Sequence, residues 1–267
     1  MDTEEGREIT TTEWYDFIGN LGDIIPALHL GGKEATRALI QMCGIAPESH
    51  VLDVGCGTGY TACEIAREHG SRVTGIDISE TMVSKAMQRA RKEGLGDRVE
   101  FRVADVFSLP FDDAFYDIAL FESVLTPIPG DKLEALMEVV RVVRPGGMIG
   151  ANESFILDSA PEEFWRLAAE HPATHDMFSP ERLRALFEEA GLEVVEVSSV
   201  KSSEAPSSMK DLGVVGLISF MVKSYWRVLG KLITDARFRR AAKVDDQVSK
   251  FISEHGGYVL IAGRVPR

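Results

Sequence analysis

Three alternate glycines in one short loop are the residues of this chain whose spacing most directly predicts ligand chemistry. Gly55, Gly57 and Gly59 follow an apolar strand predicted at residues 51–54 and precede a helix predicted at 60–69. Because glycine has no Cβ, a ligand can lie directly on such a loop. The start of a helix also presents unpaired backbone N–H groups. The segment predicts a nucleotide-type site, although a sharp turn in any α/β protein would use similar glycines.

The glycine spacing narrows the kind of ligand. A dinucleotide-binding G-x-G-x-x-G motif would place its last glycine at position 60, where this chain has Tyr60. A nucleoside-triphosphate loop of the form G-x-x-x-x-G-K-[ST] would need a lysine after Gly59, and none follows. The pattern D-x-G-x-G-x-G, from Asp53 to Gly59, instead resembles the first motif of the class I S-adenosylmethionine-dependent methyltransferases.

Acidic residues at the ends of the next predicted strands extend this resemblance. Asp77 lies 24 positions (77 − 53) after Asp53, and an acid about 20 residues after a glycine loop can bind ribose hydroxyls. Asp105 and Glu122 end the third and fourth predicted strands. The order and spacing of these pieces are similar to the family's over about residues 45–155.

The resemblance implies an α/β fold with a Rossmann-like, seven-stranded, mostly parallel sheet, an antiparallel last strand, and helices on both faces. Alternating apolar strands and amphipathic helices support this fold class. The turn Arg144-Pro-Gly-Gly147 is predicted to lead into the fifth strand. Helical spacing predicts that Met87 and Met137 face inward with the other apolar residues of their helices.

Three parts are expected along the chain. Residues 1–46 form an N-terminal helical segment covering the cofactor. Residues 47–200 and 256–267 form the methyltransferase core, and residues 201–255 form a helical insertion that caps the cleft.

The resemblance also implies S-adenosyl-L-methionine as cofactor and S-adenosyl-L-homocysteine as product. Asp53 would bind the methionine ammonium or brace the loop, Asp77 would hold the ribose, and Asp105 would meet the adenine amine. The predicted cofactor-binding residues are Tyr15, Asp53, Gly55, Cys56, Gly57, Gly59, Asp77, Ile78, Met82, Ala104, Asp105, Val106, Phe121 and Glu122.

Catalytic residues are less clearly indicated, because methyl transfer needs mainly proximity, orientation and a water-poor pocket. The candidates are His29, as a proton acceptor, and Glu122, as a base or a polar wall. Either residue could instead make a structural hydrogen bond. No metal site is predicted, because Pro172 interrupts the helix that the spacing of His171 and His175 would require.

Composition limits the partners and the location. The net charge of −13 argues against nucleic acid as the main partner, because such binding relies on clustered basic residues. The chain has only three cysteines, an acidic and polar amino terminus, and no uncharged apolar run of about 18 residues. A cytoplasmic protein is therefore expected.

The predicted insertion combines basic and aromatic side chains. Residues 223–243 contain seven basic residues and one acid, beside Phe220, Tyr225 and Trp226. This pattern is typical of a peripheral membrane contact through residues 212–243 or of a lid over an anionic substrate. A packed helix pair with a solvated basic face, and a homodimer interface, remain open as alternatives.

The function predicted is S-adenosylmethionine-dependent methyl transfer to a small molecule. The resemblance is to the group that includes ubiquinone/menaquinone C-methyltransferases and sterol or small-amine methyltransferases. One alternative is a protein or tRNA methyltransferase, but Glu122-Ser-Val-Leu-Thr stands where an Asn-Pro-Pro-Tyr signature would be expected. The other alternative is a non-catalytic sensor that binds the cofactor.

Overall fold

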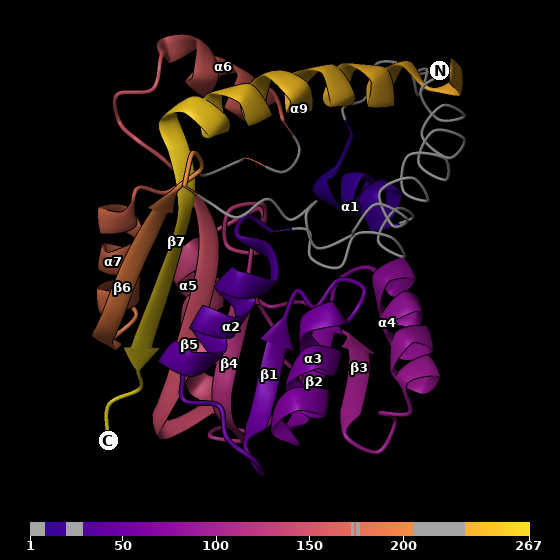
Figure 1. Ribbon diagram of the computed structural model, residues 1–267, viewed down its shortest axis with the longest axis vertical. Helices are drawn as coiled ribbons and strands as arrows, with labels where there is room; N and C mark the ends of the chain where they lie inside the picture. Colours follow the sequence, from indigo (N-terminus) through magenta and orange to yellow (C-terminus); the bar gives the residue numbers. More distant parts are fainter. Residues whose placement is uncertain (1–8, 20–28, 172–173, 175–176, 205–232) are drawn as a thin grey trace.

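A seven-stranded sheet forms the centre of the protein in a computed structural model (Figure 1). The structure describes residues 9–19, 29–171, 174, 177–204 and 233–267. The elements in chain order are α1 (Thr11–Gly19), α2 (Gly32–Met42), β1 (His50–Val54), α3 (Tyr60–His69), β2 (Arg72–Asp77), α4 (Glu80–Glu93), β3 (Val99–Val103), β4 (Tyr116–Glu122), α5 (Lys132–Val142), β5 (Val143–Ile156), α6 (Glu162–Glu170), α7 (Pro180–Glu189), β6 (Glu193–Lys201), α9 (Ala236–His255) and β7 (Gly256–Arg264).

The strand order is β3-β2-β1-β4-β5-β7-β6. Strand β7 runs antiparallel to both β5 and β6, whereas the pairs among β1 to β5 are parallel. The predicted Rossmann-like sheet with an antiparallel last strand is confirmed. Parallel strands bring their carboxyl ends to one edge of the sheet, so the loops after β1, β2, β3 and β4 meet there.

Helices cover both faces of the sheet (Figure 1). Residues of α2, α3 and α4 pack against one face, and residues of α5 and α7 pack against the other. The alternation of side chains along β1 divides its residues between the two layers, with Val51 in the first and Leu52 and Val54 in the second. The direction of each side chain at the end of such a strand is therefore fixed by its register.

Short polar side chains begin the helices beside the sheet. The Ser79 hydroxyl accepts a hydrogen bond from the Met82 backbone N–H (3.1 Å) and begins α4, which ends before Gly94 at φ 71°. Asp131 accepts from the Leu133 N–H at the start of α5. Ser179 accepts from the Arg182 N–H ahead of α7. These caps fix the lengths of the loops that reach the edge of the sheet.

One prediction about helix packing is wrong. Met87 and Met137 are 38% and 54% exposed, because the inward stripes of α4 and α5 are narrow and consist largely of smaller residues. The predicted turn at Arg144–Gly147 falls within β5 but interrupts its pairing with β4: Val143 pairs with Tyr116, the next paired residue is Met148, and Gly146 has φ 80°. A Cβ at Gly147 would lie 2.6 Å from the Asp117 carbonyl oxygen, so this glycine allows the two backbones to approach.

Helices α1, α6 and α9 lie beyond the carboxyl ends of the parallel strands (Figure 1). Trp14 of α1 packs with Phe238 and Ala241 of α9, and its ring meets His171 edge to face at 5.3 Å. Residues 205–232, which include most of the predicted membrane contact at 212–243, lie outside the described residues. No helix in the described part of the chain is long and apolar enough to cross a bilayer.

Candidate active site

A cavity of about 660 Å³ lies where the loops after β1, β2, β3 and β4 meet. This volume is in the range typical of sites for cofactors and small molecules. Helix α1 and the segment before it form one wall, through residues 9–12 and Tyr15. Of the residues predicted from the sequence, the cavity is lined by Tyr15, His29, Asp53, Gly55, Cys56, Gly57, Asp77, Ile78, Met82, Ala104, Asp105, Val106 and Glu122.

The three glycines of the loop after β1 have different tasks. All three have positive φ, at 66° for Gly55, 51° for Gly57 and 74° for Gly59. Nothing lies within 4 Å of a Cβ built on Gly57, which lines the cavity. A Cβ on Gly59 would lie 2.6 Å from the Phe101 ring. Gly59 is absent from the lining residues, so the structure places it in packing between the loop and β3, away from the predicted cofactor contact.

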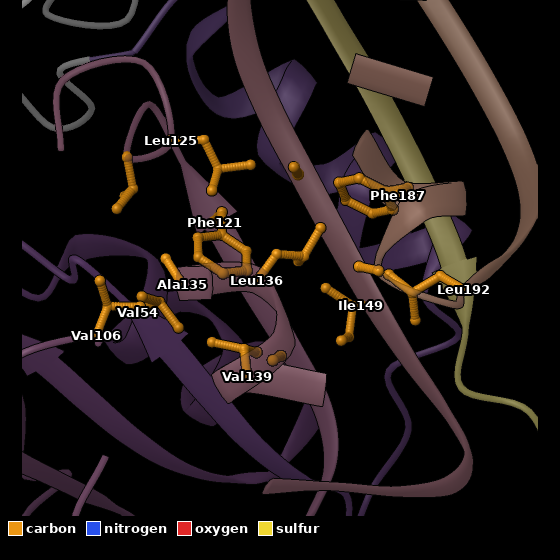
Figure 2. Close-up of a cluster of buried hydrophobic side chains, with 14 of the residues drawn as sticks. Val54, Val106, Phe121, Leu125, Ala135, Leu136, Val139, Ile149, Phe187 and Leu192 are labelled. Carbon is orange, nitrogen blue, oxygen red and sulfur yellow. The ribbon is translucent and has the colours of Figure 1, made fainter. Parts of the chain in front are cut away.

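Phe121 is the second predicted residue that does not line the cavity. It is fully buried and packs with Ala135 and Leu136 of α5 (Figure 2). Successive side chains of a strand point to opposite faces, so Phe121 and Glu122 diverge at the end of β4. Of the two residues, only Glu122 reaches the cavity.

Asp77 connects the glycine loop to the start of α4. Its Oδ2 accepts a hydrogen bond from the Gly57 N–H (2.9 Å) and its Oδ1 accepts from the Ser79 N–H (2.9 Å). Burial raises the pKa of this carboxyl, and the two hydrogen bonds oppose that rise. The Ser79 hydroxyl also donates to Asp16 of α1, which joins the covering helix to the same corner of the site.

Asp53, at the end of β1, is the most deeply buried acid of the cavity wall. Its residue is 2% exposed, and its Oδ2 has no hydrogen-bond partner among the described residues. Burial, followed by the charges of Glu122 and Asp77, raises the pKa of Asp53 well above its ordinary value. A buried acceptor without a donor is costly. The geometry therefore favours a ligand that brings a donor or a positive charge to this oxygen.

Glu122 is held by hydroxyl groups from two helices. Its Oε1 accepts a hydrogen bond from Thr36 Oγ1 of α2 (2.9 Å), and its Oε2 accepts from Thr61 Oγ1 of α3 (2.5 Å). His29 Nε2 lies 3.1 Å from Thr36 Oγ1 and 3.4 Å from Glu122 Oε1. The structure thus brings together the two catalytic candidates, although 93 positions (122 − 29) separate them in the sequence.

The loop after β4 carries the apolar wall of the cavity. Val124, Pro127, Ile128 and Pro129 line it there. Glu153 of β5 accepts hydrogen bonds from the backbone N–H groups of residues 124, 125 and 126 and from the Thr126 hydroxyl, at 2.8–3.1 Å. Burial raises the pKa of this fully buried carboxyl, and the four donors oppose the rise. Glu153 therefore fixes the position of the backbone that carries the apolar wall.

The part of the cavity wall formed by the loops after β2 and β3 differs in exposure from residue to residue. Ile78 is 55% exposed, whereas Met82 is 2% exposed. Asp105 Oδ1 accepts a hydrogen bond from the Phe107 N–H (3.0 Å). Burial raises the pKa of the Cys56 thiol well above its ordinary value, so this residue is an uncharged part of the wall. An apolar group with a polar edge matches the side chains of Ile78 and Met82 and the carboxylate of Asp105.

Several residues of the site were not found from the sequence. Thr36, Thr61 and Asn152 contact the two catalytic candidates, and Glu153 shapes the loop. Threonines within helices give no distinctive signal. The polar pair Asn152-Glu153 does interrupt an apolar strand at its carboxyl-terminal half, and that interruption could have identified both residues.

Ser123 adds an unusual backbone conformation at the same edge. It has φ 57°, which is uncommon for a residue other than glycine, and it lines the cavity directly after Glu122. Its N–H donates to the Asn152 carbonyl at 2.8 Å. Such conformations cost free energy and occur often at functional sites.

Comparison with known proteins identifies the family. A family model described as "Methyltransferase domain" matches residues 51–147. Methyltransferase GfsG of Streptomyces halstedii is 34% identical over 191 residues, which are 68% of this chain and 66% of the relative. The 27-O-demethylrifamycin SV methyltransferase of Amycolatopsis mediterranei is 32% identical over 185 residues, which are 67% of each chain. This chain thus matches about two thirds of the length of these relatives.

A solved structure is similar over nearly the whole chain. The crystal structure of the [4+2]-cyclase SpnF superposes with a TM-score of 0.76 and 25% identity, covering 97% of each chain. The fold, the glycine loop and the relatives agree. The chain belongs to the S-adenosylmethionine-dependent methyltransferases.

Proposed function

We propose that this protein transfers the methyl group of S-adenosylmethionine to a hydroxyl oxygen of a small, largely apolar molecule. The observation that carries the proposal is one continuous cavity of about 660 Å³, which joins the glycine loop and Asp77 to the apolar wall of the loop after β4. A donor and an acceptor held in one water-poor space react by proximity and orientation. The name of the Amycolatopsis relative supports oxygen as the acceptor atom.

The residues present fit the cofactor. Gly57 leaves open space beside the loop, and Asp53 Oδ2 offers an unpaired buried acceptor for the methionine ammonium. Asp77 would hold the ribose, Ile78 and Met82 would pack on the adenine ring, and Asp105 would accept from its amine. The bound cofactor supplies an electrophilic methyl carbon on a sulfonium. The chain contributes orientation, exclusion of water and the placement of acceptor groups around it.

Helices α1 and α9 support a covering role for the N-terminal segment and the insertion. They lie beyond the carboxyl ends of the strands (Figure 1). Residues 9–12 and Tyr15 line the cavity. Burial raises the pKa of the Tyr15 hydroxyl, which therefore remains a neutral hydrogen-bonding group. The proposal is that this cover closes over both substrates and excludes water.

The wider setting of the enzyme is also a proposal. Three buried free cysteines support a reducing compartment such as the cytoplasm. The homodimer and the peripheral membrane contact stay predictions, since most of residues 212–243 lie outside the described chain. Size measurement in solution and flotation with anionic liposomes test these two points.

The test of the proposed function has two steps. Isothermal calorimetry with S-adenosylmethionine and S-adenosylhomocysteine measures the donor site directly. Release of S-adenosylhomocysteine is then followed with phenols, sterols and hydroxylated macrolactones, and a trideuteromethyl label locates the new bond by mass spectrometry and NMR. We expect a methyl ether. Absence of cofactor binding, or a label found on carbon or nitrogen, would contradict the proposal.

A second candidate function follows from the similarity to the [4+2]-cyclase SpnF. The same apolar wall could fold a polyene so that a diene and an alkene within it form two new carbon–carbon bonds. Such a reaction leaves the mass of the substrate unchanged and releases no S-adenosylhomocysteine. Mass spectrometry of linear polyenes incubated with the protein therefore separates this activity from methyl transfer.

A further inference from the structure

We propose that Glu122 accepts the proton of the acceptor hydroxyl, and that His29 serves as a hydrogen-bond donor that keeps Glu122 ionised and oriented. This inference rests on the proposed function and names the base for that reaction. It assigns one catalytic residue and three positioning residues, which are His29, Thr36 and Thr61. Two of these, Thr36 and Thr61, were not expected from the sequence.

Glu122 combines a cavity position with an ordered set of donors. The residue lines the cavity while its side chain is only 7% exposed, so water has little access to it. The Thr36 and Thr61 hydroxyls occupy one acceptor site on each oxygen. A carboxylate has about four such sites, so further sites remain for an incoming hydroxyl. Hydrogen bonds to the charged form stabilise that form.

The position of the His29 hydrogen is assigned from the contacts of its two ring nitrogens. Nδ1 lies 2.9 Å from the Asn152 amide nitrogen and 3.1 Å from the Leu30 carbonyl oxygen, which is also 3.3 Å from that amide nitrogen. We assign Nδ1 as the acceptor of the Asn152 N–H, because Nε2–H then faces two acceptors, Thr36 Oγ1 and Glu122 Oε1. A neutral imidazole in this tautomer has no lone pair left for a substrate proton. We therefore assign His29 as a donor, which replaces its predicted role as proton acceptor.

The groups around Glu122 and Asp53 differ, and this difference suits the two acids to different roles. Among the described residues, the titratable groups that face Glu122 are His29 and Asp53, and the charge of Asp77 also acts on Asp53. Asp53 has the orphaned oxygen and therefore suits the cofactor ammonium, whereas the known donors of Glu122 are neutral hydroxyls and an imidazole. Once that ammonium is bound, it reduces the repulsion between the two carboxylates.

The step balances in atoms and charge. The acceptor oxygen forms a bond to the methyl carbon while the carbon–sulfur bond breaks and its electron pair stays on sulfur. The hydroxyl proton passes to Glu122. The positive charge of the sulfonium and the negative charge of the carboxylate disappear together, which leaves a neutral ether, a neutral thioether and a protonated carboxyl. A general base of this kind contributes about 10²–10⁴-fold in rate.

The first test compares two acids of the same cavity. Glu122→Gln should lower kcat by about 10²–10⁴-fold with the most active hydroxyl compound of the panel. Its affinity for S-adenosylhomocysteine, measured by calorimetry, should stay close to wild type. Asp53→Asn is the matched variant and should show the reverse, with weaker S-adenosylhomocysteine binding and a smaller loss in kcat at saturation. If Glu122→Gln mainly weakens cofactor binding and keeps kcat, Glu122 is a cofactor ligand and the proposal is wrong.

The second test concerns the positioning residues. Thr36→Val removes a donor to Glu122, so the acid limb of the pH profile of kcat should move to higher pH, and Thr36→Ser should restore it. A merely structural role would lower stability without moving this limb. Failure of the wild-type protein to bind S-adenosylmethionine would reject the proposed function itself, whereas unaffected variants in an active enzyme would reject only the base.

A third measurement needs no acceptor. In protein labelled with ¹⁵N-histidine, NMR should show His29 as the Nε2–H tautomer, and Asn152→Ala should weaken that preference. A dominant Nδ1–H form would overturn the assignment of His29 as the donor to Glu122, because Nε2 would then be an acceptor.

Discussion

Asp77 Oδ2 accepts a hydrogen bond from the backbone N–H of Gly57 at 2.9 Å, so the acid that ends β2 holds the glycine loop that follows β1. One carboxylate thereby fixes the shape of the loop and faces the space beside it. We therefore expect loop geometry and ligand affinity to be coupled through this side chain.

Replacement of Asp77 tests that coupling. In Asp77→Ala, the Gly57 and Ser79 N–H groups lose their acceptor, and we expect a loss of about 1–3 kcal/mol in stability. The increase in melting temperature produced by S-adenosylhomocysteine should disappear, because a ligand stabilises only a folded state that it binds. Thermal denaturation with and without the ligand measures both effects.

Asp117 provides the matched control for this variant. It also accepts a backbone hydrogen bond, from the His50 N–H at 2.7 Å, and it pairs with Arg144, but it lies at the start of β4, away from the cavity. Asp117→Ala should lose stability and keep the ligand-induced shift. A full shift in Asp77→Ala would contradict the ribose assignment.

The glycines of the loop should differ in their response to alanine. Gly59→Ala combines a φ of 74° with a Cβ placed 2.6 Å from Phe101 and 2.8 Å from Ala86, so we expect a loss of roughly 2–4 kcal/mol. The Cβ of Gly57→Ala would have no atom within 4 Å, so this variant should lose only about 1 kcal/mol of stability. Its methyl group would enter the cavity and weaken cofactor binding. Urea denaturation and calorimetry on both variants check this contrast, which equal effects on stability would refute.

Asp53 should lower the stability of the unliganded protein at neutral pH. Its folded-state pKa is raised, so the folded state holds its proton more tightly than the unfolded state does. Stability from this group is present at low pH and is lost as pH rises from about 4 through the folded-state pKa. Asp53→Asn should therefore gain on the order of 1 kcal/mol over wild type at pH 8, and the difference should vanish below pH 4. A constant difference across this pH range would contradict the assignment.

Glu153 should control the acceptor end of the cavity. Glu153→Gln leaves some of its four buried donors facing an amide NH₂, and we expect a loss of roughly 3 kcal/mol. The KM for the acceptor should rise more than the dissociation constant for the cofactor, because the displaced residues line the apolar wall. Thr126→Val removes only one of these bonds and should lose about 1 kcal/mol. Equal changes for both ligands in Glu153→Gln would show that Glu153 has no selective effect on the acceptor.

The amino-acid sequence by itself determined the class of fold and the residues at the strand ends that line the cavity. The loop from Asp53 to Gly59 and the acids Asp77 and Asp105 are local signals, because each stands at or just past the carboxyl end of a strand and parallel strands end at one edge.

Only the tertiary structure decided which way Phe121 and Glu122 point, that Gly59 serves packing, and that His29 meets Glu122 through Thr36. Strand register selects the face of each side chain, and a one-residue difference reverses it. The contacts of His29, Thr36 and Asn152 join segments that are far apart in the chain, and no local pattern of residue types records such a distance. Residues at strand ends that line the cavity can thus be predicted from spacing, whereas the groups that orient them depend on how the helices pack across the sheet.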